Sequence, residues 1–246
     1  MEGDAAAQFD SFLAADEVST TIHTFADILA AAGCAHLKGC GLELYHALKS
    51  ALAPRLNFRV GKIFPTLDAR LAAAHKLRSS VGGLQGALPA YRVLVCGAGP
   101  VGLRSAVEAA MLGLEVLVVE KRASFSRANI ITTWDETMAD LLALGAKIYR
   151  PNLCSTGNPK HVGTRELQLI LLKDLLLLGG AVRYGMSIVG LVPPTTGAPG
   201  RWQGRIAPYI RPDKDDDGEL DAAAKALEFQ RIKSYEKEFV GLGNKG

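Results

Sequence analysis

The stretch YRVLVCGAGPVGLRSAVEAAMLGLEVLVVEKR, residues 91–122, decides the fold of this 246-residue chain. Its apolar run over 92–96 predicts a buried strand, and the run rich in small residues over 101–112 predicts a helix. A second apolar run over 115–119 predicts another strand. Continuous rather than alternating apolar residues are typical of parallel strands that are covered on both faces. The stretch therefore predicts an α/β fold with a parallel sheet flanked by helices.

Three glycines, Gly97, Gly99 and Gly102, stand between the first strand and the helix. Gly97 permits a tight turn, Gly99 lets the backbone approach a diphosphate, and Gly102 lets the helix pack closely on the strand. The helix would point its first N–H groups at the phosphates. Glu120 ends the second strand, where a carboxylate accepts hydrogen bonds from a ribose diol and repels a 2′-phosphate. The pattern predicts a Rossmann-type site for FAD or NAD rather than NADP. The alternative is a Rossmann-type unit that no longer binds a nucleotide and keeps its glycines only for packing.

Apolar residues at helical spacing predict helices before the glycine stretch. The helices are expected around residues 9–13, 22–29, 44–52 and 67–77. Pro54 is expected to end the third helix, and Pro65 to interrupt the chain before the fourth. The run VGGLQG at 81–86 predicts a loop. We therefore expect a helical extension over 1–88 packed on the nucleotide domain, a Rossmann-type domain over 89–212 and a charged helical tail over 213–246.

Further elements follow the second strand. Thr164 is expected to cap the N-terminus of a long helix that Gly179 and Gly180 end. The other expected elements are a helix over 137–144 that Gly145 ends, a strand pair or one bent strand over 181–192, a strand over 202–210 and a charged helix over 220–240.

The composition is that of an ordinary globular protein, with 48% hydrophobic and 22% charged residues. A net charge of +3 indicates neither nucleic acid nor an anionic membrane as the main partner. The first residues lack the pattern of a signal peptide, and no apolar run is long enough to cross a bilayer. We therefore expect a soluble cytoplasmic protein without membrane insertion.

The cysteine and histidine spacings do not suggest a metal site. Four cysteines lack any C-x-x-C pair, and five histidines are scattered without ligand spacing. We expect reduced, mostly buried thiols and no bound metal.

Three phrases downstream of Glu120 carry a family resemblance: KRASFSRANIITTW, LLALGAKIYRPNLC and TRELQLILLKDLLLLGGAV. Together with LYHALKSAL and LDARLA in the helical segment, they resemble the flavin monooxygenase domain of the MICAL proteins, NADPH-dependent enzymes that oxidise actin. The resemblance covers residues 8–210 and is most specific in its middle third. It implies FAD as cofactor, NADPH as reductant, F-actin as partner and a place in the cytoskeleton.

The resemblance also implies a set of cofactor-binding residues. It places Glu120, Lys121 and Arg122 on the adenosine side of FAD, and Arg127 and Asn129 toward its phosphate or flavin side. Arginine offers a fixed fork of donors suited to phosphate. A solvated strand end is the alternative for Lys121 and Arg122. The complete predicted set is Gly97, Gly99, Val101, Gly102, Glu120, Lys121, Arg122, Arg127 and Asn129.

Three more residues could have either a structural role or a role at the cofactor site. Val101 stands where the family usually has Cys, which is tolerated if the backbone N–H does the binding. Trp134 is expected in the core in preference to the flavin pocket. Arg165 is interpreted as the ion-paired start of a helix, with a supporting role at the site as the alternative. No catalytic residue is predicted.

The sequence departs from the family after Ile210. The family's later Asp-Gly and Gly-Asp segments hold the ribityl chain and the flavin ring, whereas here the sole Asp-Gly pair, Asp217-Gly218, lies in an acidic turn. We therefore expect the C-terminal half of the flavoprotein domain to be missing. Three functions stay open: a truncated MICAL-like FAD-dependent, NADPH-using monooxygenase acting on actin methionines, a non-catalytic dinucleotide-binding or protein-interaction module, and a small-aromatic flavoprotein hydroxylase.

Overall fold

The computed structural model describes most of the chain, in two compact units. The described residues are 5–80, 91–127, 129–150, 152–154, 158, 160–194, 202–209 and, for the backbone, 239–240. The first unit comprises Met1–Val118 and Ser124–Val182, and the second comprises Val119–Ala123 and Arg183–Gly246. The loop expected at 81–86 lies outside the described residues.

The N-terminal part of the first unit is helical, as the apolar spacing predicts. Its elements are α1 (Ala5–Ala14), α2 (Val18–Ala31), the 3-10 helix η1 (Ala35–Leu37), α3 (Leu42–Leu52), the 3-10 helix η2 (Ala53–Arg55), α4 (Phe58–Gly61) and α5 (Ile63–Ser80). Aromatic rings join three of these helices: Phe9 stacks on Phe64 with ring centroids 5.8 Å apart, and Phe12 lies 5.4 Å from Phe25. The buried face of α2 uses Ile28 beside Leu29, while Ile22 is only half-buried.

The two prolines behave differently. Helix α3 ends at Leu52, two residues before Pro54, as predicted. Pro65 does not interrupt the chain, because it is the third residue of α5. The prediction for Pro65 was wrong for a physical reason: backbone N–H groups in the first turn of a helix have no partner within the helix, so proline there removes no hydrogen bond.

The glycine stretch forms the predicted strand–helix–strand unit. Strand β1 (Arg92–Cys96), helix α6 (Pro100–Met111) and strand β2 (Glu115–Glu120) follow one another. Strand β5 (Ala181–Tyr184) completes a three-stranded sheet in the order β1-β2-β5. Helix α6 packs on β1 and on α8 (Thr164–Leu177). The α/β fold class, with helices flanking a parallel sheet and helices preceding it, is confirmed.

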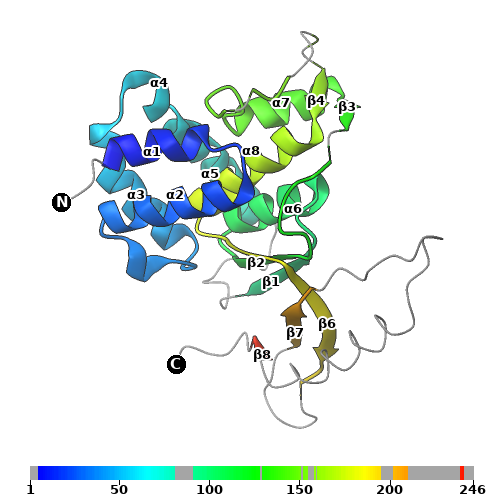
Figure 1. Ribbon diagram of the computed structural model, residues 1–246. Helices are drawn as coiled ribbons and strands as arrows, with labels where there is room; N and C mark the ends of the chain where they lie inside the picture. The colour runs from blue at the N-terminus through cyan, green and yellow to red at the C-terminus, as the bar shows by residue number, and fades with distance from the viewer. Residues whose placement is uncertain are drawn as a thin grey trace. The chain divides into compact units, whose positions relative to one another are not determined.

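Helix α8 is the centre of the first unit. It contacts α2, α3 and α6, and Figure 1 shows it surrounded by these helices. Gly179, with φ +79°, follows its end, as predicted. Thr164 is not its N-cap: Gly163 holds that position in extended backbone, without a side-chain cap. The cause is the strand that precedes the helix, since Gly163 is also the last residue of β4 (His161–Gly163).

A short antiparallel pair was missed by the sequence analysis. Strand β3 (Ile130–Thr132) pairs with β4, with Ile131 opposite Val162. Each strand has three residues, too few for an alternating pattern to be visible. Helix α7 (Asp135–Ala143) follows β3, and Gly145, with φ +90°, lies just beyond its end.

Two charged residues of α8 are fully buried. Lys173 Nζ donates to three backbone carbonyls, those of Leu13 at 2.9 Å and of Ala15 and Arg150 at 2.7 Å each. Burial lowers the pKa of Lys173 to about 7. The neighbouring Asp174 accepts a short hydrogen bond from the Tyr149 hydroxyl, and burial raises the pKa of this carboxyl. These contacts hold the end of α1 and the segment after α7 on α8.

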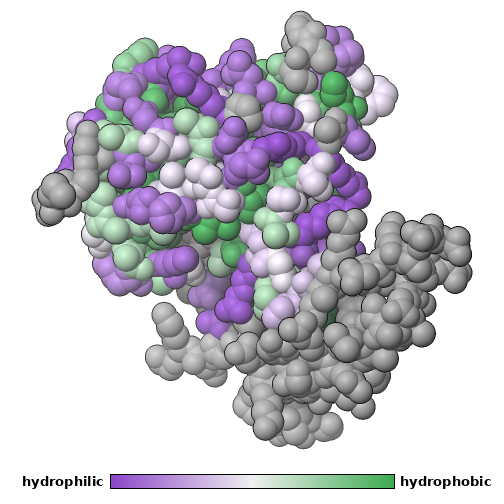
Figure 2. Space-filling model, in the orientation of Figure 1, coloured by the Kyte–Doolittle hydropathy of each residue, from purple (hydrophilic) through white to green (hydrophobic). Residues whose placement is uncertain are grey.

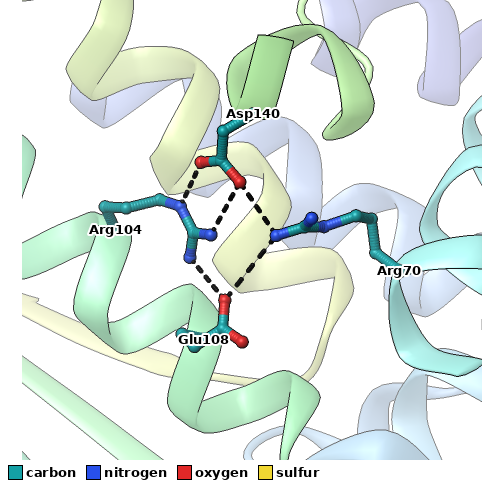
Figure 3. A network of polar contacts seen from close by, with 4 residues as sticks. All are labelled: Arg70, Arg104, Glu108 and Asp140. Atoms are coloured by element: carbon teal, nitrogen blue, oxygen red, sulfur yellow. Dashed lines mark hydrogen bonds and ion pairs between the residues drawn. The ribbon is translucent and has the colours of Figure 1, made fainter. Parts of the chain in front are cut away.

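A second polar cluster joins α5, α6 and α7 (Figure 3). Asp140 accepts from Arg104 Nε at 2.7 Å and from Arg70 Nη2 at 2.9 Å. Glu108 Oε2 accepts from Arg104 Nη1 at 2.8 Å. The hydrogen bonds from Arg104 lower the pKa of Asp140, so this carboxylate stays charged. The cluster fixes helix α5 of the N-terminal part against the helix that follows the glycine turn.

The second unit contains an antiparallel sheet in the order β6-β7-β8. Its strands are β6 (Met186–Val192), β7 (Gln203–Pro208) and β8 (Phe239–Val240), with Ile188 paired to Ile206. The region 181–192 is thus two strands of different sheets, separated by Gly185 at φ +68°. The helix expected over 220–240 is wrong at 239–240, where backbone pairing with β7 makes a strand. The rest of that tail lies outside the described residues.

Candidate nucleotide-binding site

The glycine turn needs its glycines at two positions. Gly97, just after β1, has φ +98°, a backbone conformation that side chains disfavour. A Cβ added at Gly102 would lie 2.2 Å from the carbonyl oxygen of Gly97, far inside van der Waals contact. The backbone of the turn and the first turn of α6 therefore touch directly. This is the close packing of helix on strand that the sequence predicts.

The N-terminus of α6 is open. Gly99 is its N-cap and provides no side-chain cap, and a Cβ added there would meet nothing within 4 Å. The Val101 side chain, one residue into the first turn, is 81% exposed. Among the described residues, no atom beyond the chain neighbours of Gly99 lies within 4 Å of that added Cβ, so the positive end of the helix dipole and the first N–H groups have room for a ligand beside Gly99. A diphosphate fits this arrangement of donors.

Gln168, which was not predicted from the sequence, supports the glycine turn by a hydrogen bond to its backbone. Gln168, on α8, donates from Nε2 to the backbone oxygen of Ala98 at 2.7 Å. Both residues are buried, and Ala98 is fully inaccessible. The signal in the sequence is a lone amide inside the apolar run LQLILL, because a buried amide needs a hydrogen-bond partner. Gln168 therefore fixes the middle residue of the glycine turn.

Arg127 and Asn129 lie on an exposed segment of the first unit. The backbone oxygen of Asn129 accepts from the N–H of Thr164 at 2.9 Å, which ties this segment to the start of α8. Within the described part of the chain, neither side chain has a hydrogen-bond or ion-pair partner. Both are therefore available to an external group, as the predicted cofactor role requires.

Trp134 is not in the core, so that prediction was wrong. Its side chain is 79% exposed, and Ile130 on β3 is 53% exposed. Figure 2 shows hydrophobic surface in the region where β3 lies in Figure 1. Trp134 directly precedes α7 and holds its N-cap position, so the backbone fixes it while its ring stays outside.

Glu120, Lys121 and Arg122 belong to the second unit. Glu120, the last residue of β2, is nearly buried, and its carboxylate accepts from the backbone N–H of Arg122 at 2.9 Å. Burial and the nearby Glu120 charge raise the pKa of Tyr184. Lys121 Nζ lies 5.5 Å from the centre of the Tyr209 ring, in cation–π contact. The side chains of Lys121 and Arg122 are exposed, as at a solvated strand end.

Arg165 has the structural role predicted for it. At the start of α8 it donates to the backbone oxygen of Asp16 at 2.9 Å and forms an ion pair with Glu17. These contacts connect α8 to the loop between α1 and α2.

The cysteines are free, but the prediction that most are buried was wrong. Cys34 is buried, Cys40 and Cys154 are half-buried, and Cys96, at the end of β1, is exposed. Burial raises the pKa of the Cys34 thiol. In the described ranges, His, Cys, Asp and Glu residues do not gather in threes that could hold a metal ion. The described helices include none with the length and apolar character to cross a membrane.

Comparisons with known proteins find similarity over the glycine turn. The FAD binding domain family matches residues 90–164, which contain the glycine turn. The [F-actin]-monooxygenase MICAL1 of Bos taurus is 40% identical over 207 residues, covering 83% of this chain and 18% of the relative. The [F-actin]-monooxygenase Mical of Drosophila melanogaster is 37% identical over 203 residues, covering 81% of this chain and 4% of the relative.

A solved structure is similar at lower identity. The crystal structure of aklavinone-11 hydroxylase in complex with FAD and aklavinone is 22% identical, covers 55% of this chain and 31% of that chain, and has a TM-score of 0.40. The chain spans less than a fifth of the length of the two curated MICAL relatives. The match to the FAD binding domain family and the similarity to the two MICAL relatives both include the glycine turn, so this part of the chain is similar to the FAD domain of those monooxygenases.

Proposed function

We propose that the chain holds FAD for a monooxygenase that takes electrons from NADPH and oxidises methionine side chains of actin. The observation that carries the proposal is the glycine turn, with Gly97 at positive φ and an open N-terminus on α6. Similarity to the MICAL relatives, which are named F-actin monooxygenases, supports the activity and the substrate. A cytoplasmic place beside actin filaments belongs to the same proposal.

The residues have distinct roles in this proposal. The backbone at Gly99, Val101 and Gly102 binds the diphosphate, and Glu120 accepts hydrogen bonds from the ribose. Arg127 and Asn129 contact the phosphate or flavin side of the cofactor. Bound flavin would supply the redox and oxygen chemistry, while the protein binds and orients it.

Titration of the full chain with FAD tests the proposal. Binding is followed by the quenching of flavin fluorescence, and the expected result is a saturable change that NAD does not compete away. Consumption of NADPH in the presence of oxygen is then measured with and without filamentous actin. Actin-stimulated NADPH consumption supports the complete proposal.

Other outcomes separate the alternatives. FAD binding without NADPH consumption indicates a non-catalytic dinucleotide-binding module. Stimulation by small phenols in place of actin indicates a flavoprotein hydroxylase for small aromatic substrates. Absence of FAD binding would overturn the proposal altogether.

A further inference from the structure

A groove on the helical part of the first unit lies apart from the glycine turn. Its volume is about 470 Å³, within the range of ligand-binding pockets. Helix α1, the region of α4 and the segment after α7 provide its walls, and Figure 1 shows α1 and α4 next to each other. Its lining includes Asp10, Leu13, Asn57, Arg59, Ile148 and Arg150.

Two arginine side chains face this groove without partners. Arg59 comes from α4, and Arg150 comes from the segment after α7. Within the described residues, neither guanidinium group makes an ion pair or a hydrogen bond. Asp10 lines the same groove but is paired with neither arginine. A guanidinium group offers a planar fork of donors that matches a carboxylate.

Hydrogen bonds hold the backbone that carries each arginine. The N–H of Arg150 donates to the Leu13 oxygen at 3.0 Å, and Lys173 Nζ donates to the oxygens of both residues. The side chain of Asn57 accepts from the N–H of Arg59 at 3.1 Å and caps α4. The groove is therefore preformed, so a ligand that binds there does not have to order its walls.

The composition of the groove discriminates between anions. Besides the two arginines, the groove has an acceptor in Asp10 and an apolar wall at Ile148, and a fully deprotonated phosphate can use neither of them. A peptide with acidic side chains can place carboxylates at the arginines, donate a backbone N–H to Asp10 and lay methylene groups on the apolar walls. We propose that this groove binds an acidic peptide segment of a partner protein.

Fluorescence anisotropy of the full chain with a labelled peptide tests the proposal. The probe is fluorescein-labelled Glu-Glu-Leu-Glu-Glu-Leu, and the control peptide has Gln in place of Glu. We expect saturable binding of the acidic peptide alone. Arg59→Gln and Arg150→Gln should each weaken it about fivefold to tenfold, and the double variant should abolish it. The variants change exposed side chains, and thermal unfolding checks that they fold.

Arg55→Gln is the matched control, because Arg55 is an exposed arginine on η2 that does not line the groove. It should change the affinity less than about twofold. An equal loss with Arg55→Gln would show general surface attraction and overturn the proposal. Absence of binding by the acidic peptide would overturn it as well.

Asp10→Asn tests the placement of the peptide, and inorganic phosphate separates a peptide from a small anion. Asp10→Asn removes a negative charge and keeps an acceptor oxygen, so it should leave binding of the probe intact or strengthen it, and loss of binding in this variant would contradict the proposed placement of the peptide. Displacement of the probe by phosphate at equal concentration would assign the groove to small anions and contradict the proposal.

Discussion

Helix α8 supports two regions that differ in what they leave exposed. One is the glycine turn, and the other is the set of hydrogen bonds from Lys173 to the end of α1, which we call the anchor. At the turn, Gln168 holds one buried carbonyl, and the rest of the site is bare backbone that faces outward. At the anchor, Lys173 holds three carbonyls and leaves nothing free. The turn consists of residues with little or no side chain, which leaves room for a ligand. In the anchor, a buried lysine donates hydrogen bonds to the carbonyls at the end of α1.

This difference explains why the glycine turn could be predicted from the sequence and the anchor could not. A ligand-binding turn restricts residue types at fixed spacing, so its glycines are visible as a motif. The anchor joins backbone oxygens to a single lysine far away in sequence. Every residue type has a backbone oxygen, so these acceptors do not restrict which residues occur there. Variants of the two regions should therefore differ in what they damage.

The largest effect is expected from Lys173→Met, which removes the anchor. Three buried carbonyls lose their donor, and the free energy of unfolding should fall by about 3–5 kcal/mol. Urea unfolding followed by circular dichroism measures the change. Lys147→Met, at an exposed lysine, is the matched control and should change little. A loss below about 1 kcal/mol for Lys173→Met would contradict the role of the anchor.

The same lysine predicts a dependence on pH. The pKa of Lys173 is lowered to about 7 in the folded chain, whereas an unfolded lysine keeps its proton up to about pH 10. Between these values the unfolded state binds more protons, so the contribution of Lys173 to the free energy of unfolding rises with pH, by at most about 1.4 kcal/mol per unit. The stability difference between the native chain and Lys173→Met should therefore grow from about pH 7 to about pH 9. A difference that stays constant would show that this pKa is not lowered.

At the glycine turn, two alanine substitutions should separate folding from binding. Gly102→Ala places a Cβ against the Gly97 oxygen and should lower the free energy of unfolding by about 3 kcal/mol. Gly99→Ala meets no protein atom and should leave stability within about 0.5 kcal/mol while weakening FAD binding about tenfold, because the methyl group lies where the diphosphate approaches. Urea unfolding and FAD titration are measured on both variants. Equal stability losses would contradict the geometry of the turn.

The smallest effect is expected from Gln168→Leu. The variant leaves the Ala98 oxygen without its donor and should cost about 1–2 kcal/mol of stability. A relaxed turn should also lower FAD affinity beyond what the loss of stability explains, which titration well below the unfolding temperature detects. Unchanged FAD affinity would restrict Gln168 to a structural role.

Much of the fold could be predicted from the sequence. The strand β1 and the glycine turn were correct because apolar runs and glycine spacing are local signals. The N-terminal helices were correct because their buried faces repeat at helical spacing. Pro65 was misread because the same residue type fits inside a first turn as well as before it.

The rest depends on contacts between distant residues. Strands β3 and β4 were missed because neither has a pattern of its own, and each exists through pairing with the other. Trp134 was assigned to the core because its size favours burial, but the direction of a side chain at a helix start is set by the backbone around it. The bond from Gln168 to Ala98 spans 70 residues, and only the lone amide hints at it.

The anchor on α8 has a consequence for the order in which the chain can fold during synthesis. The carbonyls of Leu13 and Ala15 leave the ribosome well before the lysine that donates to them, which lies 160 and 158 residues further along. At the usual pace of translation this is a delay of roughly ten to thirty seconds. Until then the end of α1 must stay hydrated, so α1 is completed only after α8 has been made.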